Sequence, residues 1–277
     1  MISVLLPSKN RPEKFANFVD SAKKLAMNPN SLEFVVYRDK SDTSDYPEMS
    51  NVKYISGDLK DIPSMYNLCA SKAKHNIFFL AADDVLVRTK DWDFIVSNAF
   101  EVLADPLIGI HGDDLGQNPL LHATHFFISS KCYEVLGFVF PVIPGFIASD
   151  LWLTNLLDYL NKRVFIVDLI IEHLHPVWGK GSLDLTYKNK FVSEKKFGID
   201  YFNPRKVDEF TSQVVAKIMA SRYWMASGRV ENPVLIINLE LKLSAFFYKR
   251  NLLEILRRSL RWRLIKIRLC VFERLHS

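Results

Sequence analysis

Short apolar runs alternate with amphipathic segments over the first hundred residues, and no other feature of the sequence restricts the fold as strongly. Each apolar run has the length of a strand, and the expected strands cover residues 2–6, 32–37, 52–55 and 77–81. The segments between and after them repeat apolar residues at helical spacing, and the expected helices cover residues 15–26, 64–73 and 92–103. Strands that alternate with helices predict an α/β fold with a mostly parallel, doubly wound sheet that helices cover on both faces.

The composition fits a globular protein with a large core. Of the 277 residues, 49% are hydrophobic and 24% are charged, which excludes an intrinsically disordered chain. One domain of roughly 200 to 250 residues with an appendage fits this length as well as two small domains do. The three cysteines form no C-x-x-C pair, so the sequence suggests neither a disulfide framework nor a zinc site and fits a reducing, cytoplasmic setting. The first residues show no signal peptide, and no uninterrupted apolar stretch of about 20 residues predicts a membrane span.

Beyond residue 104 the pattern changes from regular alternation to a mixture of elements. Short strands are expected at residues 108–111, 123–129 and 164–173, and helices near 131–136 and 150–160. From residue 184 onward the pattern is helical. We therefore expect one α/β domain at residues 1–180 and a helical C-terminal region at residues 181–277.

The positive charge of the chain is concentrated near its end. The formal net charge is +5, yet residues 249–277 alone hold nine Lys and Arg against two Glu. Aromatic residues, Trp262 and Phe272 among them, lie between these arginines, which suits an interfacial helix on an anionic membrane surface. The alternative is a helix that packs on the catalytic domain with solvated arginines. Nucleic-acid binding is not expected, because the rest of the chain is near neutral and carries no recognised nucleic-acid motif.

Polar residues follow the expected strands where each strand ends. Residues 7–11 follow the first strand, residues 38–42 the second, and Asp83-Asp84 the strand at 77–81. Because such sheets bind ligands at the carboxyl ends of their strands, we expect these groups at one edge. Two adjacent carboxylates repel each other unless a cation neutralises them, and their oxygens suit Mg²⁺ or Mn²⁺ on a diphosphate. The alternative is that Asp84 caps a turn and Asp83 faces solvent.

These segments arrive in the order found in family-2-like glycosyltransferases of the glycosyltransferase A fold, which the sequence resembles over about residues 1–180. The segments are residues 2–11 (ISVLLPSKNR), 35–42 (VVYRDKSD), 64–73 and 77–84 (IFFLAADD). The resemblance implies a nucleotide-sugar-binding catalytic domain whose first loop, together with an Asp after the second strand, holds the nucleoside. The donor-binding residues that it implies are Pro7, Ser8, Arg11, Asp39, Ser64, Asn67, Asp83 and Asp84.

The sequence departs from the family at the Asp-x-Asp motif, which binds the metal and the diphosphate. This motif falls on Ala81-Ala82-Asp83, so its first Asp is missing, whereas Asp83 retains the second, usually the direct metal ligand. Asp84 stands next to it and could compensate. The resemblance implies a divalent cation, Mn²⁺ or Mg²⁺, and a metal-free or inactive variant is the alternative.

Two later segments complete the expected site. Residues 145–152 resemble the family's acidic motif, in which Asp150 opens a helix and supplies the catalytic base, while an ordinary helix N-cap is the alternative. In residues 170–176, His173 and His175 have the same parity on a strand, and either resembles the histidine metal ligand of the family. A further polar cluster either lines the acceptor or sugar pocket or forms a turn, and consists of His111, Asp113, Asp114, His122 and His125.

The sequence thus predicts a glycosyltransferase of the hexosyltransferase type that moves one sugar from a nucleotide-sugar donor to a glycan or lipid-linked saccharide acceptor. The resemblance implies inversion at the anomeric carbon and a role in surface-polysaccharide synthesis, at the inner face of the cell membrane as a peripheral protein. One alternative is a non-catalytic binder of sugar nucleotides or glycans, suggested by Ala81. A nucleotidyltransferase is a weaker alternative, because loop 7–11 contains no glycine with which to cradle a phosphate.

Overall fold

The computed structural model describes residues 1–143, 149–188, 204–224 and 235–236. The strands form a single sheet in the order β3-β2-β1-β4-β7-β6-β8-β5, with β9 paired to β8. Their bounds are β1 (Ile2–Ser8), β2 (Leu32–Asp39), β3 (Val52–Gly57), β4 (Ile77–Leu80), β5 (Val85–Val87), β6 (Gly109–Asp113), β7 (Phe126–Ser129), β8 (Arg163–His173) and β9 (Leu235–Ile236). Strands β3, β2, β1 and β4 run parallel, as do β6, β8 and β9, whereas β7 is antiparallel to β4 and β6, and β5 is antiparallel to β8. The predicted mostly parallel sheet is confirmed.

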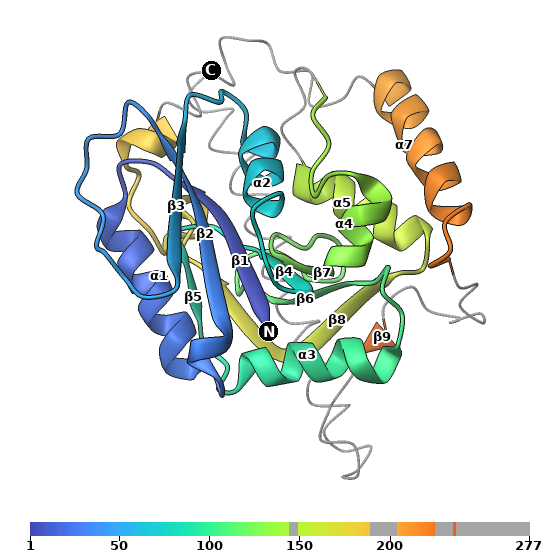
Figure 1. Ribbon diagram of the computed structural model, residues 1–277, viewed down its shortest axis with the longest axis horizontal. Helices are drawn as coiled ribbons and strands as arrows, with labels where there is room; N and C mark the ends of the chain where they lie inside the picture. Colours follow the sequence, from blue (N-terminus) through green and yellow to red (C-terminus); the bar gives the residue numbers. More distant parts are fainter. Residues whose placement is uncertain (144–148, 189–203, 225–234, 237–277) are drawn as a thin grey trace, which may run out of the picture.

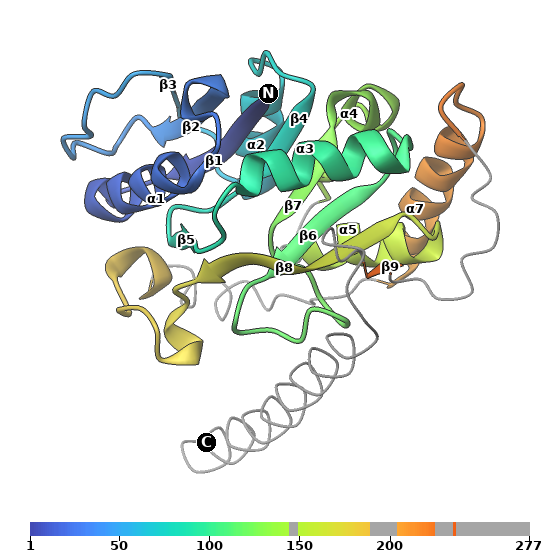
Figure 2. The same cartoon turned by 90° about the horizontal axis from the view of Figure 1, so that it is seen from below.

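Helices cover both faces of this sheet (Figures 1 and 2). Their bounds are α1 (Pro12–Leu25), α2 (Ile62–Ala70), α3 (Trp92–Leu103), α4 (Ser130–Leu136), α5 (Ser149–Tyr159) and α7 (Pro204–Met219), and single 3-10 turns lie at η1 (Pro29–Ser31) and η2 (Pro176–Trp178). Helices α1 and α3 pack on one face, and α2, α4, α5 and α7 pack on the other. Strand β1 contributes side chains to the apolar layers on both faces of the sheet. Val4 and Leu6 face the α1 side, whereas Leu5 faces the α2 side.

Aromatic side chains fill the layer between the sheet and helices α1 and α3. Phe79 of β4 stacks on Phe127 of β7, with ring centroids 4.2 Å apart, and Phe18 of α1 meets Phe79 edge to face at 6.2 Å. The buried indole of Trp92 donates a hydrogen bond from Nε1 to the carbonyl oxygen of Ala22 at 2.9 Å, which joins α3 to α1. This packing fixes α1, and with it the loop that leads from β1 into the helix.

The structure differs from the expected elements in a few places. The three-residue strand β5 was not expected, and β9 lies in a region expected to be helical. The basic segment 249–277 lies outside the described residues. The division at residue 180 stays a prediction, although Val214 and Ile218 of α7 pack in the same apolar cluster as α4 and α5. Within the ranges described, no helix is both long enough and apolar enough to cross a bilayer.

Candidate functional site

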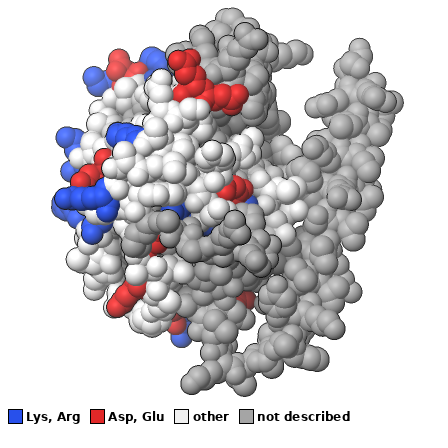
Figure 3. Space-filling model, turned by 90° about the vertical axis from the view of Figure 1, so that its right-hand side faces the viewer, with Lys and Arg blue, Asp and Glu red and all other residues white. Residues whose placement is uncertain are grey.

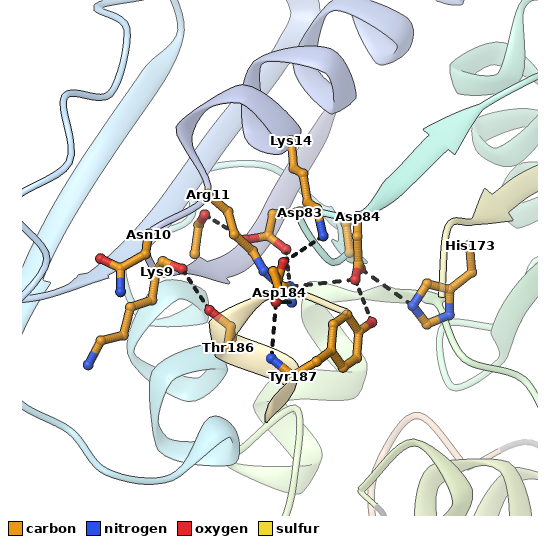
Figure 4. A network of polar contacts seen from close by, with 12 residues as sticks. Lys9, Asn10, Arg11, Lys14, Asp83, Asp84, His173, Asp184, Thr186 and Tyr187 are labelled. Carbon is orange, nitrogen blue, oxygen red and sulfur yellow. Dashed lines mark hydrogen bonds and ion pairs between the residues drawn. The ribbon is translucent and has the colours of Figure 1, made fainter. Parts of the chain in front are cut away.

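The loop after β1 meets the acid pair after β4 at one edge of the sheet. Because β1 and β4 are parallel neighbours, their carboxyl ends lie side by side. The Ser8 hydroxyl donates to Oδ2 of Asp83 at 2.7 Å, and Nη1 of Arg11 lies 2.9 Å from Oδ1 of Asp83 and 3.5 Å from Oδ2 of Asp84. The Tyr46 hydroxyl lies 2.8 Å from the Ser8 hydroxyl. The expected meeting of Ser8, Arg11 and the two aspartates is present in the structure. Figure 4 shows Arg11 between Asp83 and Asp84.

Both aspartates are buried, and their different surroundings shift their pKa values in opposite directions. Burial raises the pKa of Asp83 to about 6, even though the Arg11 charge acts in the opposite direction. Burial would raise the pKa of Asp84 as well, but the interactions with His173, Tyr187 and Arg11 outweigh it and hold that pKa below its ordinary value. The alternative is that Asp84 caps a turn while Asp83 faces solvent. It does not describe this arrangement, because both side chains are buried and contact polar partners.

His173 is the histidine that faces the acid pair. It lies at the end of β8, where β5 pairs Val85 with His173, and its Nε2 is 3.4 Å from Oδ1 of Asp84. Nδ1 of the His175 ring instead accepts a hydrogen bond from the backbone N–H of Val177 at 3.1 Å and caps the turn η2. The two rings lie 5.1 Å apart. Although the two histidines have the same parity in the sequence, only His173 of the two contacts the acid pair in the described structure.

The donor set around Asp84 fits a divalent cation of the kind that keeps some of its own water. Mg²⁺ and Mn²⁺ accept carboxylate oxygen, Mn²⁺ also accepts imidazole nitrogen, and Mg²⁺ is commonly bound by one or two protein carboxylates plus substrate phosphates. Asp84 and His173 could supply such ligands, with Asp83 beside them. The oxygens of both aspartates already have protein partners, so a bound cation would replace some of these contacts. Among the residues that the structure describes, no three His, Cys, Asp or Glu side chains are grouped to hold a metal without substrate.

A segment after η2 covers the acid pair, and the sequence did not single it out. Asp184 lies 2.9 Å from Nη2 of Arg11 and 2.7 Å from Nζ of Lys14. The Tyr187 hydroxyl donates to Oδ2 of Asp84 at 2.5 Å, and the guanidinium of Arg11 lies 4.6 Å from the centre of the Tyr187 ring. Burial alone would raise the pKa of Asp184, but the hydrogen bonds from Arg11 and Lys14 lower it to about 2. Asp184 is therefore an anion held on two cations.

The residues expected to hold the nucleoside lie on the strand ends β1 and β2. Pro7 pairs in register with Tyr37 of β2, and Asp39 ends that strand. Nζ of Lys9 is 3.0 Å from Asp39, whose Oδ1 also accepts hydrogen bonds from the backbone and hydroxyl of Ser41. The Ser41 hydrogen bonds lower the pKa of Asp39 to about 2, so a charged carboxylate is available at this rim.

Two of the expected donor-binding residues, Ser64 and Asn67, lie on α2 and form hydrogen bonds that hold neighbouring backbone in place. Oδ1 of Asn67 accepts hydrogen bonds from the backbone N–H groups of Val139 and Phe140, and its Nδ2 donates to the Phe140 carbonyl at 2.9 Å. The backbone of Ser64 donates to Asp61, which caps α2. Neither side chain is hydrogen-bonded to the acid pair within the described ranges. Their donor-binding role stays a prediction.

Asp150 begins α5 and faces a histidine. Its Oδ2 is 3.1 Å from Nε2 of His122, and its backbone carbonyl accepts a hydrogen bond from the Thr154 hydroxyl at 2.8 Å. Burial lowers the pKa of His122, but the Asp150 carboxylate outweighs it and raises the pKa overall. The same Thr154 hydroxyl accepts from the backbone N–H of Ala123 at 3.2 Å, so it fixes the His122 loop against the start of α5.

The buried side chain of Arg163 forms hydrogen bonds to the backbone of the loop that carries His122. Nη1 and Nη2 of Arg163 each donate at 2.8 Å, to the carbonyl oxygens of Pro119 and Leu120. Asp114 accepts hydrogen bonds from the backbone N–H groups of Gly116 and Gln117, so of the two alternatives for this cluster the turn describes Asp114. His111 is fully buried against Phe165, with ring centroids 5.1 Å apart, and belongs to the core rather than to a pocket.

Buried residues connect the acid pair with Asp150. The His125 ring lies 5.0 Å from that of His173, and the Asp84 and Asp150 carboxylates both act on the pKa of His125, which burial lowers to about 3. Burial raises the pKa of the buried Tyr66 hydroxyl, and the charges of Asp83, Asp84 and Asp150 raise it further. The pKa values of His125 and Tyr66 thus respond both to Asp150 and to the acid pair.

Comparison with known proteins gives structural likenesses and no sequence relative. No family model and no curated protein matches the chain. It is similar to S. aureus TarS, with 13% identity and a TM-score of 0.48 over 80% of this chain and 44% of TarS, so it spans less than half of that protein. It is also similar to TarS 1-349 in complex with UDP, with 13% identity and a TM-score of 0.48 over 80% of this chain and 72% of that one. The mannosyltransferase PcManGT from Pyrobaculum calidifontis, in complex with GDP-Man and Mn²⁺, shows 15% identity and a TM-score of 0.47 over 79% of this chain and 75% of its own.

Proposed function

We propose that this protein transfers one sugar from a nucleotide-sugar donor to a glycan or lipid-linked saccharide acceptor. The observation that carries the proposal is the convergence of Arg11, the buried Asp83-Asp84 pair and His173 at the carboxyl edge of a parallel sheet. Such an edge is the usual ligand site of open α/β sheets. Cations and carboxylates together are what a diphosphate needs, since the carboxylates hold a metal ion and the guanidinium binds phosphoryl oxygens.

The donor half of the reaction uses the ends of β1, β2 and β4. Pro7, Ser8 and Asp39 line the nucleoside side, and Arg11 faces the phosphates. A divalent cation, Mn²⁺ or Mg²⁺, would be held by Asp84 and His173 with Asp83 beside them. When bound, that cation supplies positive charge that stabilises the leaving diphosphate. The Arg11 guanidinium also stabilises the negative charge of the leaving diphosphate. Because the site is buried, water screens this attraction less than it would at the surface.

The acceptor half of the reaction uses the start of α5. The Asp150 carboxylate accepts the proton of the acceptor hydroxyl as that oxygen forms a bond to the anomeric carbon. The bond from the anomeric carbon to the diphosphate breaks, and its electron pair leaves with the diphosphate. Attack from the face opposite to the leaving group inverts the anomeric centre, which is the outcome that the family resemblance implies. His122 lies against Asp150 and keeps its carboxylate oriented.

The experiment that tests the proposed function is a screen of nucleotide sugars. The purified chain is incubated with UDP-, GDP- and dTDP-linked hexoses, with Mn²⁺, Mg²⁺ or EDTA, and free nucleoside diphosphate is measured. We expect release from one donor, with faster release when a divalent cation is present. Absence of release from every donor, although one of them binds, contradicts the proposal.

A second candidate function is a non-catalytic binder of sugar nucleotides. Two observations favour it: Ala81 stands where the family carries the first Asp of its motif, and Arg11 already pairs with both remaining carboxylates. Such a binder would show donor binding in isothermal titration, with neither hydrolysis nor transfer at any Mn²⁺ concentration. The two functions therefore differ in turnover and not in affinity.

We further propose that the protein acts in surface-polysaccharide synthesis while bound peripherally to the inner face of the cell membrane. The support is the basic segment 249–277, which lies outside the described residues. On the face shown in Figure 3, the described surface is mostly uncharged, with basic side chains gathered at one edge. In the sequence, residues 1–248 hold 27 Lys and Arg against 29 Asp and Glu, so the excess of basic residues comes from residues 249–277.

Salt should release the protein from anionic membranes. With vesicles that contain one third phosphatidylglycerol, we expect the full chain to co-float at low ionic strength and to dissociate at about 0.5 M NaCl, because salt screens the attraction between basic side chains and lipid headgroups. Neutral phosphatidylcholine vesicles serve as the control. Equal binding to both vesicle types, or binding that survives salt, would overturn the electrostatic attachment.

A further inference from the structure

Asp184 occupies the place in the candidate site where an external anion would bind. Its carboxylate bridges Arg11 and Lys14, with Oδ1 2.9 Å from Nη2 of Arg11 and Oδ2 2.7 Å from Nζ of Lys14 (Figure 4). The same Arg11 reaches the acid pair through Nη1. A carboxylate held by a guanidinium and an ammonium has the geometry with which proteins also bind phosphoryl oxygens.

Four contacts of Thr186 and Tyr187 keep this carboxylate in place. The Tyr187 hydroxyl donates to Asp84, the Tyr187 ring lies under the Arg11 guanidinium, and the Thr186 hydroxyl donates to the Lys9 carbonyl at 3.2 Å. The backbone N–H of Tyr187 also donates to Oδ1 of Asp184 at 3.0 Å. The three contacts made by the side chains of Thr186 and Tyr187 go to the loop after β1 or to the acid pair, so residues 184–187 close over the expected donor site.

The cationic pair has capacity left for a larger anion. The Arg11 side chain is only 9% exposed, yet its Nε has no hydrogen-bond partner within the described part of the chain. A cavity of about 280 Å³ adjoins Lys14, with Asp20, Asp83 and Asp84 also in its wall. Three carboxylates, those of Asp83, Asp84 and Asp184, share the two cations, so departure of Asp184 would leave a neutral cluster that receives an anion more readily.

We propose that Arg11 and Lys14 form the anion site for the donor's diphosphate, and that Asp184 fills this site as an internal competitor until the diphosphate displaces it. The inference rests on the proposed function for the identity of the anion, because a nucleotide sugar carries a diphosphate. Lys14 thereby becomes a donor-binding residue, and residues 184–187 become the segment that must leave before the donor binds. Affinity for the donor is lowered by the fraction of molecules in which Asp184 occupies the site.

Removal of the Asp184 charge should therefore tighten anion binding. Inorganic diphosphate is titrated calorimetrically into the full chain in EDTA buffer, so that no metal mediates the contact. For Asp184→Asn we expect an affinity about tenfold higher than that of the unmodified protein, because the competing anion is gone. The asparagine Oδ1 still accepts the hydrogen bond from Tyr187, which preserves the turn, and circular dichroism checks that the variant is folded. Asp184→Ala is the second variant, and we expect the same gain from it.

Two controls identify the source of that gain. Asp208→Asn removes an equal charge from an exposed position of α7 and should leave the affinity unchanged. Lys14→Ala should weaken diphosphate binding, and in the Lys14→Ala background the gain from Asp184→Asn should shrink to less than about twofold, because the two residues act on one site. Unchanged or weaker binding by folded Asp184→Asn would overturn the anion site, as would an equal gain from Asp208→Asn.

The readout is independent of sugar transfer. A gain in diphosphate affinity in a protein that transfers no sugar supports the anion site and counts against the proposed reaction alone. Sugar transfer by a protein in which Asp184→Asn brings no gain supports the reaction and overturns the internal competitor.

Discussion

Asp83→Asn should lower donor turnover at least about a hundredfold, because an asparagine keeps the shape of the side chain but removes charge from the place where the leaving diphosphate and its metal ion are stabilised. Asp83 is buried and accepts from Ser8 on one oxygen and from Arg11 on the other. An asparagine can still accept from Arg11 through its oxygen, and its NH2 group can donate to the Ser8 hydroxyl, which then accepts. The substitution therefore changes charge more than packing. Release of nucleoside diphosphate from the donor is the measurement.

The matched control for Asp83→Asn is Asp208→Asn, which makes the same chemical change on the exposed side of α7. Turnover by the control should equal that of the unmodified protein. Unmodified turnover in Asp83→Asn itself would remove Asp83 from the chemistry and leave Asp84 with His173 as the remaining candidates. A melting temperature close to that of the unmodified protein is required before either result is interpreted.

The second large effect is expected at Asp150. Asp150→Asn should leave donor affinity nearly intact, since the residue is placed on the acceptor side, while sugar transfer falls by roughly a hundred- to ten-thousandfold, as removal of a general base does. An asparagine can still accept the hydrogen bond from the Leu151 N–H at the start of α5, so the helix end is preserved. Donor affinity and transfer rate are measured on the same preparation.

Loss of donor affinity together with transfer would contradict this role for Asp150. Asp150 would then be a helix cap or a donor ligand, and the base would have to be sought at Asp113 or His125. Of these two, Asp113 accepts a hydrogen bond from the Leu115 N–H, and His125 is buried beside His173. Neither is as open to an acceptor as Asp150, whose side chain is 35% exposed.

The parts of this fold that the sequence predicts are those set by local pattern. Strands β1, β2 and β4 are apolar runs buried on both faces, and α1 repeats apolar residues on the one face that packs on the sheet. Because parallel neighbours bring their carboxyl ends together, the meeting of Arg11 with Asp83 follows from the order of the strands. Strand β5 escapes prediction because three residues are too few to show a period.

The partners of the acid pair could not be predicted, because they come from distant parts of the chain. Tyr187 is 103 positions from Asp84, and Tyr46 is 38 positions from Ser8. No periodicity links such residues, and the only local signal near Asp184 is the preceding Gly179-Lys180-Gly181 loop. The choice between His173 and His175 likewise depends on where β8 ends, since His175 lies beyond the strand and caps a turn.

The role of Arg11 also differs from what residue types alone imply. Two adjacent carboxylates pointed to a cation, and the structure provides a guanidinium at both of them. A protein cation and a metal ion are compatible at such a pair, because one guanidinium carries a single positive charge against two carboxylates. Asp184 then adds a third carboxylate, which makes the cluster still more demanding of a cation.

The central claim is that this site breaks the bond between sugar and diphosphate and gives the sugar to an acceptor hydroxyl. The most direct measurement follows both products in one reaction, with nucleoside diphosphate measured by chromatography and acceptor mass by mass spectrometry. The account predicts one nucleoside diphosphate released for each hexose gained by the acceptor, and loss of both in Asp83→Asn. Donor binding without either product, or release of inorganic diphosphate in place of nucleoside diphosphate, would contradict it.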